Sequence, residues 1–209
     1  MEPWEFVRAI VVVVAAYVIG GIPWGVIVAR LSGGPDPRTI GSGRTGGSNV
    51  MRALGPRLAL LAGLLDLLKG VVAVLLARVL GAGPGVEVFA ALAAVIGHSR
   101  SPFLGFGGGR GVATGFGALL AFSPLVALAI LPVFAITIWV TRYSSLGSLV
   151  ASATGGVLLA IATAVVPLSP WYYLYAVGGT LLIFLFHADN IQRLLAGEER
   201  RIGTPRSPG

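Results

Sequence analysis

Long apolar stretches that carry almost no charge alternate with short polar connections along this chain, and this pattern constrains the fold more than any other feature. Only 11% of the 209 residues are charged, whereas a soluble domain usually has about 25%. The remaining polar residues are too few to cover a globule of this size in water. We therefore predict an all-α integral membrane bundle with the lipid bilayer as its surroundings.

Seven stretches are predicted as membrane-spanning helices. A span needs about 20 apolar residues, so the third and fourth stretches are short and are expected to be half-helices or to continue into neighbouring loops. The fourth and fifth stay separate because Pro124 breaks a helix. We expect one domain over residues 1–203 and a disordered tail over 204–209. The stretches cover residues 6–29 (bent near 20–23), 58–80, 86–97, 112–122, 125–140, 149–166 and 171–186.

The basic residues lie mostly on one predicted side of the membrane. Seven spans place the termini on opposite sides, and with the N-terminus outside, 12 of the 15 basic residues fall in inner loops. The positive-inside rule then predicts an external N-terminus and a cytoplasmic C-terminus. A net charge of +7 spread between apolar runs in this way does not indicate a nucleic-acid partner. The inner basic residues are Arg30, Arg38, Arg44, Arg52, Arg57, Arg100, Arg110, Arg142, Arg193, Arg200, Arg201 and Arg206.

Residue usage also excludes several kinds of site. Without Cys there is no thiolate nucleophile, disulfide or cysteine-ligated metal. Two His and eight scattered carboxylates predict no permanent metal centre. Glycine is abundant instead, with 31 residues against a usual share of about 7%. Close helix packing explains part of this excess, and the remainder points to a site in the loops.

The first glycine-rich connection, residues 38–56, has the composition of a phosphate cradle. Glycines let backbone N–H groups converge on an anion, and Ser48 or Asn49 can cap a short helix whose start would face it. The same composition fits a basic loop that lies on anionic lipid headgroups. Three polar side chains stand beside the predicted helix start: Ser42, Arg44 and Arg52.

The second connection, residues 97–114, is a glycine run that places Arg110 at the mouth of the next helix. It lacks the G-x-x-x-x-G-K-[ST] spacing of a Walker A loop. An arginine there can contact two phosphate oxygens at once. The alternative is a re-entrant turn whose glycines serve only close packing.

Two pairs of polar residues stand three positions apart, which is one helical face. His187 and Asn190 follow the last span, and a neutral His there can act as a base near pH 7; the alternative is a His that only caps the helix. Asp66 and Lys69 lie inside the second span and most simply neutralise each other.

Four segments in order resemble the PlsY-type acyl-phosphate:glycerol-3-phosphate acyltransferases of bacteria: residues 41–52, 65–70, 97–114 and 187–199. The resemblance covers nearly the whole chain and implies a multi-pass plasma-membrane enzyme whose active site faces the cytoplasm. Such an enzyme moves a fatty acyl group from acyl phosphate to the 1-hydroxyl of glycerol 3-phosphate, without a cofactor. It gives 1-acylglycerol 3-phosphate and phosphate, the first acylation of phospholipid synthesis. We expect a monomer.

The resemblance also implies roles for individual residues. Arg52 and Arg110, with N–H groups of Gly43 and Gly108–Gly111, are expected to bind phosphates, and Arg110 replaces the family's Lys with altered reach. Ser42 and Asn190 are expected to hydrogen-bond substrate. His187 is the candidate base, with a substrate phosphate oxygen as the alternative. Further expected binding residues are Gly41, Arg44, Ser48, Asn49, Lys69, His98, Thr114, Arg193 and Glu199.

Two other kinds of acyl or phosphate enzyme do not fit the sequence. The H-x-x-x-x-D motif of acyl-CoA-dependent acyltransferases is absent, because Phe103 and Gln192 stand five residues after the two His. A CDP-alcohol phosphotransferase needs several Asp on its helices, and Asp66 is alone. A small anion transporter or channel remains as the alternative function, since its short, glycine-broken helices would look similar.

Overall fold

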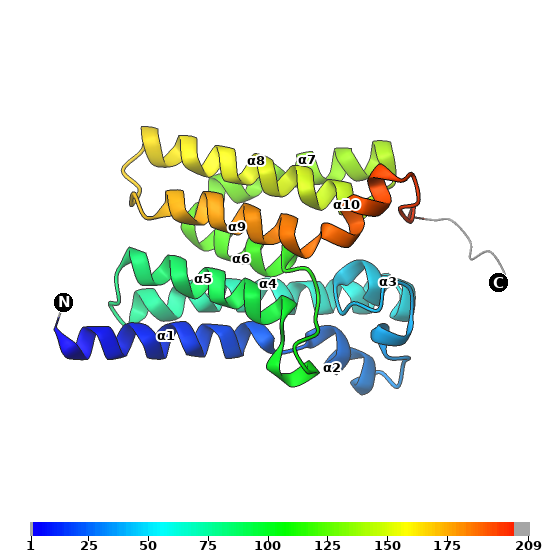
Figure 1. Ribbon diagram of the computed structural model, residues 1–209, viewed down its shortest axis with the longest axis horizontal. Helices are drawn as coiled ribbons and strands as arrows, with labels where there is room; N and C mark the ends of the chain where they lie inside the picture. Colours follow the sequence, from blue (N-terminus) through cyan, green and yellow to red (C-terminus); the bar gives the residue numbers. More distant parts are fainter. Residues whose placement is uncertain (1, 203–209) are drawn as a thin grey trace.

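The computed structural model describes residues 2–202, and all regular structure within them is helical (Figure 1). The predicted tail, residues 204–209, lies outside the described residues. The helices are α1 (Pro3–Gly21), α2 (Trp24–Leu31), α3 (Gly47–Leu54), α4 (Pro56–Val79), α5 (Pro84–Ser99), α6 (Val112–Phe122), α7 (Pro124–Thr141), α8 (Ser144–Val165), α9 (Tyr172–Phe186) and α10 (Ala188–Leu195), with 3-10 turns η1 (Pro37–Thr39) and η2 (Pro102–Leu104).

The helices form two groups that meet along α6. Helices α1, α4 and α5 pack together on one side, while α7, α8 and α9 pack together on the other. The short helix α6 contacts α4, α5, α7, α8 and α9, and α5 also contacts α9 (Figure 1). Helices α2, α3 and α10 lie at the end of the bundle opposite to the N-terminus. We call this the loop end.

Every predicted apolar stretch is helical, the first as the two helices α1 and α2, but fewer than seven helices qualify as complete spans. Four helices among the described residues, α1, α4, α7 and α8, are long and apolar enough to cross a membrane. Helices α9 and α10 give a fifth if the bent pair is counted as one span. Helix α6 has 11 residues and α5 has 16, so both fall short of the roughly 20 residues that a complete span requires.

The outer surface of the bundle is apolar, as a lipid-facing surface must be. Leu128 on α7 is 57% exposed and Leu181 on α9 is 63% exposed. Similar residues continue along α1 and α4, where Val14 and Leu68 are exposed. An apolar exterior of this extent is unstable in water but stable in hydrocarbon, provided that every backbone polar group is satisfied within the protein.

The predicted bend near residues 20–23 is a complete break between α1 and α2. Helix α1 ends before Pro23, which cannot continue it, so the carbonyl groups of Gly21 and Ile22 at this end have no partner within α1. Two buried side chains replace those partners: Ser101 Oγ donates to Gly21 O at 2.6 Å, and Lys69 Nζ donates to Ile22 O at 2.9 Å. Asp66 Oδ1 neutralises that ammonium at 2.8 Å, as the spacing of the pair predicted.

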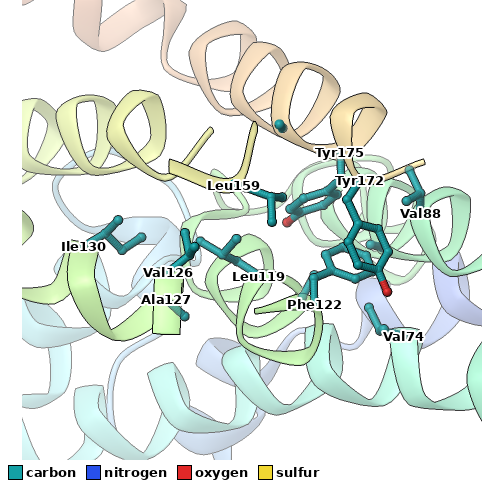
Figure 2. Packing of buried hydrophobic residues seen from close by; sticks show 13 residues of the cluster. Val74, Val88, Leu119, Phe122, Val126, Ala127, Ile130, Leu159, Tyr172 and Tyr175 are labelled. Carbon is teal, nitrogen blue, oxygen red and sulfur yellow. The ribbon is translucent and has the colours of Figure 1, made fainter. Parts of the chain in front are cut away.

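The largest core cluster surrounds the far end of α6. Phe122 lies between the rings of Tyr172 and Tyr175, with centroids 4.6 and 4.8 Å away, and Leu159 and Val74 complete the packing (Figure 2). Together these side chains join α4, α6, α8 and α9. This cluster fixes α6 from its far end, so its first turn has a defined position at the loop end.

Helices α4 and α6 approach closely because glycines face backbone at both contacts. A side chain on Gly70 would collide with the backbone of Thr114, and one on Gly117 would collide with the backbone of Leu67. The hydroxyl of Thr114 also donates to Asp66 O at 2.9 Å. The first turn of α6 is therefore held against the middle of α4.

The short helix predicted in the first glycine-rich connection is α3, but its cap differs from our expectation. We expected Ser48 or Asn49 to cap it, and this is wrong. Gly46 occupies the cap position without a side-chain hydrogen bond, so Ser48 and Asn49 lie within the first turn. The side chain of Asn49 is therefore free to turn back into the preceding loop.

Candidate active site

A cavity of about 540 Å³ opens at the loop end and continues between the helices. Its polar part is formed by the first glycine-rich connection, by the end of the second and by the segment around α10. Its apolar part runs between α4, α6, α7, α8 and α9. The polar and charged residues that line it are Ser42, Arg44, Ser48, Asn49, Arg52, Asp66, His98, Arg110, Ser144, Ser145, Ser148, Ser152, Thr180, His187, Asn190, Arg193, Glu199 and Arg200.

The first connection is folded around one side chain, that of Asn49. Its Nδ2 lies within hydrogen-bond distance of the carbonyl oxygens of Pro37 (2.5 Å), Ile40 (2.8 Å) and Arg44 (2.8 Å), while its Oδ1 accepts from Ser42 N at 3.2 Å. Asn49 is only 2% exposed. Its polar atoms are thus occupied within the loop, and it shapes the cradle without being free to bind a substrate.

The second connection is held by backbone contacts and by Ser101. Ser101 N donates to Gly107 O at 2.9 Å, and Phe106 N donates to Ser101 O at 2.8 Å. Beyond this turn, Gly109 N donates to His98 O at 3.1 Å. A Cβ on Gly108 would collide with His98 O, and one on Gly109 would collide with the imidazole ring of the same residue. Glycine is required at position 108, where the contact is with backbone, and a side chain at position 109 would have to displace the buried ring of His98.

Arg110 follows directly and stands beside the first turn of α6. Gly111, at φ +78°, caps that helix without a side-chain hydrogen bond, so the first N–H groups of α6 have no intrahelical partner. Gly111, Val112 and Ala113 line the cavity at this point. Unpaired amides and the positive end of the helix dipole favour an anion here.

A network of side chains from α8, α10 and the following segment forms the opposite wall. Glu199 Oε1 accepts from Asn190 Nδ2 at 2.8 Å and from Ser145 Oγ at 3.1 Å, and Arg193 Nε donates to Glu199 Oε2 at 2.9 Å. Asp189 Oδ2 lies 2.9 Å from Arg110 Nη2 and 3.2 Å from Arg193 Nη2. These contacts tie the wall to the second glycine-rich connection.

Two buried polar atoms of this network have no partner among the described residues: Arg110 Nε and Asn190 Oδ1. Both residues line the cavity. A buried donor or acceptor without a hydrogen bond is costly, so such atoms favour a ligand that supplies the missing bonds. A guanidinium N–H matches a phosphate oxygen, and an amide oxygen matches a hydroxyl group.

His187 lies at the 64° bend between α9 and α10 and is 2% exposed. Its Nδ1 is 2.8 Å from Ile183 O. Because a carbonyl oxygen can only accept, Nδ1 carries the proton, and the lone pair of the neutral ring is on Nε2. His187 lines the cavity together with Asn190, as their spacing predicted for a shared face.

The polar part of the cavity is strongly cationic. Arg44 and Arg52 line it and form no ion pair within residues 2–202. Burial lowers the pKa of Arg52 and of Arg110, and for Arg110 the neighbouring Asp189 opposes that shift. Both arginines nevertheless remain protonated at physiological pH. An anionic ligand would relieve the desolvation of these charges.

Comparison with known proteins identifies the family. Residues 10–197 match the family model described as glycerol-3-phosphate acyltransferase. The chain belongs to this family. The glycerol-3-phosphate acyltransferase of Rubrobacter xylanophilus is 42% identical over 93% of this chain and 95% of its own length. That of a Synechococcus strain is 44% identical over 97% of each chain, and that of Thermus thermophilus is 44% identical over 90% of this chain and 92% of its own.

Two solved structures of PlsY, an integral membrane glycerol 3-phosphate acyltransferase, share the fold. The glycerol 3-phosphate form superposes with a TM-score of 0.86 at 39% identity, covering 94% of this chain and 96% of that one. The lysophosphatidic acid form gives 0.85 at 37% identity, with the same coverage. The predicted family, the all-α membrane fold and the acyltransferase function are thereby confirmed.

In this acyltransferase most of the expected site residues line the one cavity. It brings together Ser42, Arg44, Ser48, Asn49, Arg52, His98, Arg110, Gly111, His187, Asn190, Arg193 and Glu199. Six others do not line it: Gly41, Gly43, Lys69, Gly108, Gly109 and Thr114. Of these, Lys69 binds Ile22 O and Asp66, and Thr114 joins α6 to α4, so the geometry gives both a structural part.

Two backbone amides that we assigned to phosphate are already occupied. Gly43 N donates to Ile40 O at 3.1 Å, and Gly109 N donates to His98 O at 3.1 Å. The expectation that these two groups bind a phosphate is therefore wrong for this structure. Their glycines instead allow the tight turns of the two connections, and Gly43 has a φ of +68°.

Sequence reasoning missed two residues of the site. Ser145 donates to Glu199 from the start of α8, and Asp189 pairs with two arginines from α10. Asp189 stands next to Asn190 and could have been noticed as the acidic partner of a basic site. Ser145 carries no such signal, because its part depends on the start of α8 lying beside Glu199 in the segment that follows α10. Across residues 2–202, no three His, Asp or Glu side chains are grouped as metal ligands would be.

Proposed function

We propose that this acyltransferase transfers a fatty acyl group from an acyl phosphate to the 1-hydroxyl of glycerol 3-phosphate. One observation carries the proposal: a single cavity joins a cationic polar part to a long apolar part. A donor with a phosphate headgroup and a hydrocarbon chain fits both parts, and the arginines leave charge for the second phosphate. The products are 1-acylglycerol 3-phosphate and inorganic phosphate.

We assign one phosphate to each glycine-rich connection. Arg110 Nε and the first N–H groups of α6 lie where the headgroup of a donor meets the apolar part. Ser42, Arg44 and Arg52 form the outer side, which is open to a water-soluble substrate. Glycerol 3-phosphate would bind there, with its hydroxyl groups directed toward Asn190.

The reaction needs positioning and charge stabilisation more than a protein nucleophile. The 1-hydroxyl oxygen attacks the carbonyl carbon, a new C–O ester bond forms, and the bond from that carbon to the bridging phosphate oxygen breaks. The leaving phosphate takes the electron pair, and the hydroxyl proton passes to a base. Because the donor is already activated, holding both substrates in the correct orientation supplies much of the rate, and Arg110 stabilises the developing negative charge.

We propose that His187 Nε2 accepts the proton of the 1-hydroxyl group. The hydrogen bond from Nδ1 to Ile183 O keeps the lone pair of the neutral ring on Nε2. Replacing a general base commonly costs about 10²-fold or more. We therefore expect His187→Ala to lower kcat by about 10²-fold and to alter the pH dependence of kcat. If the pH–rate profile of the variant matched that of the unsubstituted protein, we would assign the proton acceptor to a phosphate oxygen of the substrate instead.

We also propose that the loop end faces the cytoplasm, with seven spans in a plasma-membrane protein that acts as a monomer. In that count α5, α6 and the α9–α10 pair cross together with the four long helices. The absence of native Cys makes a labelling test direct. Glu198→Cys at the loop end should react only from inside intact cells, and Val166→Cys at the other end should react from outside.

The function is tested by mixing purified protein with acyl phosphate and glycerol 3-phosphate and measuring both products. We expect 1-acylglycerol 3-phosphate and inorganic phosphate in equal amounts, and no release of phosphate when glycerol 3-phosphate is omitted. Transfer from acyl-CoA but not from acyl phosphate would contradict the proposed donor. Movement of glycerol 3-phosphate into liposomes without product formation would support a transporter instead.

A further inference from the structure

Three ionisable side chains are buried together between α4 and α5, and the proposed reaction uses none of them. Asp66 and Lys69 on α4 and His98 on α5 are each no more than 6% exposed. Lys69 Nζ lies 2.8 Å from Asp66 Oδ1, and His98 Nδ1 lies 3.5 Å from the same oxygen. We call these three residues the buried triad. Ionisable groups inside a membrane bundle are costly to bury, so their presence calls for a function.

Charge balance accounts for the two triad residues of α4 and leaves His98 unexplained. Lys69 donates to Ile22 O at 2.9 Å, and Asp66 neutralises its ammonium group. This ion pair would be complete without a histidine. His98 Nδ1 is buried near the carboxylate and has no hydrogen bond to any residue in the range 2–202. The negative charge of Asp66 favours the proton of the neutral ring on Nδ1 and attracts that N–H group, so the carboxylate orients the ring.

His98 also supports the second glycine-rich connection. Its backbone oxygen accepts from Gly109 N at 3.1 Å. A Cβ on Gly109 would meet His98 Nε2 before any other atom, so this second ring nitrogen lies against the Gly109 backbone. Because the imidazole ring is flat and rigid, it fixes the spacing between Asp66 and Gly109. Arg110 is the next residue, so its position depends on the orientation of this ring.

Asp66 also holds the first turn of α6, through its backbone. Thr114 Oγ1 donates to Asp66 O at 2.9 Å, and both residues are buried. The backbone of Thr114 lies so close to Gly70 on α4 that a side chain there would collide with it. Arg110 and the first N–H groups of α6 are thus both positioned from one residue of α4. Arg110 depends on it through His98, and the first turn of α6 depends on it through Thr114.

The start of the second connection is anchored at a different place. Ser101 Oγ donates to Gly21 O at 2.6 Å, and Ser101 N donates to Gly107 O at 2.9 Å. The connection is therefore held at Ser101 and again at His98, and Arg110 directly follows the second anchor. Displacement of the His98 ring would move Arg110 while the first anchor stayed in place.

The first glycine-rich connection has an organising group of its own. The side-chain hydrogen bonds of Asn49 all lie within residues 37–49. A change in the triad should therefore affect the phosphate that is bound at the second connection and spare the phosphate that is bound at the first. The two substrates provide separate measurements of these two effects.

We infer that Asp66 and His98 are positioning residues for the acyl donor, because the carboxylate orients the imidazole ring and the ring holds Arg110 beside the first turn of α6. The inference rests on the proposed function, which assigns the phosphate of acyl phosphate to that place. A substitution in the triad leaves every phosphate-binding group in the chain but displaces some of them. A misplacement of about 1 Å can cost about 10²-fold in rate.

The test compares Asp66→Asn with Glu87→Gln and measures kcat and KM for both substrates. Each variant turns a buried carboxylate into an amide of similar size and leaves a cation without its partner. Glu87 is the matched control, because it pairs with Arg78 Nη2 at 2.8 Å and does not line the cavity. For Asp66→Asn we expect kcat/KM for acyl phosphate to fall by about 10²-fold, with a raised KM for acyl phosphate and an unchanged KM for glycerol 3-phosphate. Glu87→Gln should leave both KM values unchanged.

His98→Ala keeps the inference testable if Asp66→Asn fails to fold, because it leaves the ion pair of Asp66 and Lys69 intact. It should raise the KM for acyl phosphate alone in the same way. The inference is overturned if folded variants retain the KM for acyl phosphate of the unsubstituted protein, or if the KM for glycerol 3-phosphate rises by the same factor. Failure of the proposed function would look different, because the unsubstituted protein would then transfer no acyl group from acyl phosphate.

Discussion

The two glycine-rich connections reach the same cavity but are held in opposite ways. The first is shaped by a side chain, since Asn49 Nδ2 lies within hydrogen-bond distance of three carbonyl oxygens and Asn49 Oδ1 accepts from one backbone amide. The second depends on residues without side chains, because the backbone at Gly108 and Gly109 lies in direct contact with His98. The first connection is wrapped around the side chain of Asn49, whereas the second packs against the end of α5 at His98.

This difference predicts how much activity a substitution in each connection removes. Hydrogen bonds in a loop at the surface can be replaced by water at modest cost. Water cannot compensate in the same way for a lost glycine, because an added Cβ would have to displace the residues of α5 that the backbone contacts. We therefore expect the second connection to be the more sensitive of the two, although both present arginine to the same ligands.

The largest expected effect is that of Arg110→Ala in the second connection. It removes the charge beside the first turn of α6 and a donor with no protein partner, and one such group is commonly worth about 10³-fold in kcat. Arg52→Ala should cost less, because Arg52 is more exposed. Steady-state kinetics of both variants tests the order.

Two further variants sharpen that result. Arg110→Lys retains a cation and should recover most of the loss, as the lysine of the resembled family implies. Arg57→Ala is the control for the loss of a basic residue, because Arg57 is exposed and does not line the cavity. A folded Arg110→Ala protein with near-normal turnover would contradict the phosphate-binding role of Arg110.

The next effect is that of Gly109→Ala, which removes no functional group. The new methyl would meet the imidazole ring of His98 and displace the connection that carries Arg110. A misplacement of about 1 Å can cost about 10²-fold in rate. If the collision is the cause, His98→Ala should cost much less activity in the Gly109→Ala protein than in the unsubstituted one, which a double-mutant cycle measures. Losses that simply add would contradict this reading of the contact.

Much of the fold was predictable, because apolar runs and proline breaks are local signals. The range 112–122 of α6 was predicted as observed, and a bend was expected near residues 20–23, where the structure has a complete break. The number of complete spans was not recoverable in the same way. Helices α5 and α6 are short, and their contribution depends on how far the connections enter the bundle, which apolar length alone does not specify.

The site was predictable where a residue type implies its chemistry. Arg52, Arg110 and Asn190 line the cavity as expected. Asn49 was expected to bind substrate, but its side-chain amide forms hydrogen bonds within the first connection and holds that loop together. Lys69 was expected near a phosphate, but it satisfies a carbonyl group freed by the break in α1. Sequence shows that a polar group is present, while the partner it satisfies depends on backbone that folding brings near.

The smallest of these effects should come from Asn49→Ala, which tests the first connection directly. The variant leaves the carbonyl oxygens of Pro37, Ile40 and Arg44 without their shared donor, and the space left by the buried side chain lies among exposed residues of the loop, so water can enter it. Because water can replace most of these bonds, we take the net cost at the site to be about that of one hydrogen bond, about 1 kcal/mol, and expect about a 10-fold loss in kcat/KM for glycerol 3-phosphate, expressed mainly in KM. Thermal unfolding should move little. A loss larger than that of Gly109→Ala would reverse the comparison and make the hydrogen-bonded connection the less tolerant of the two.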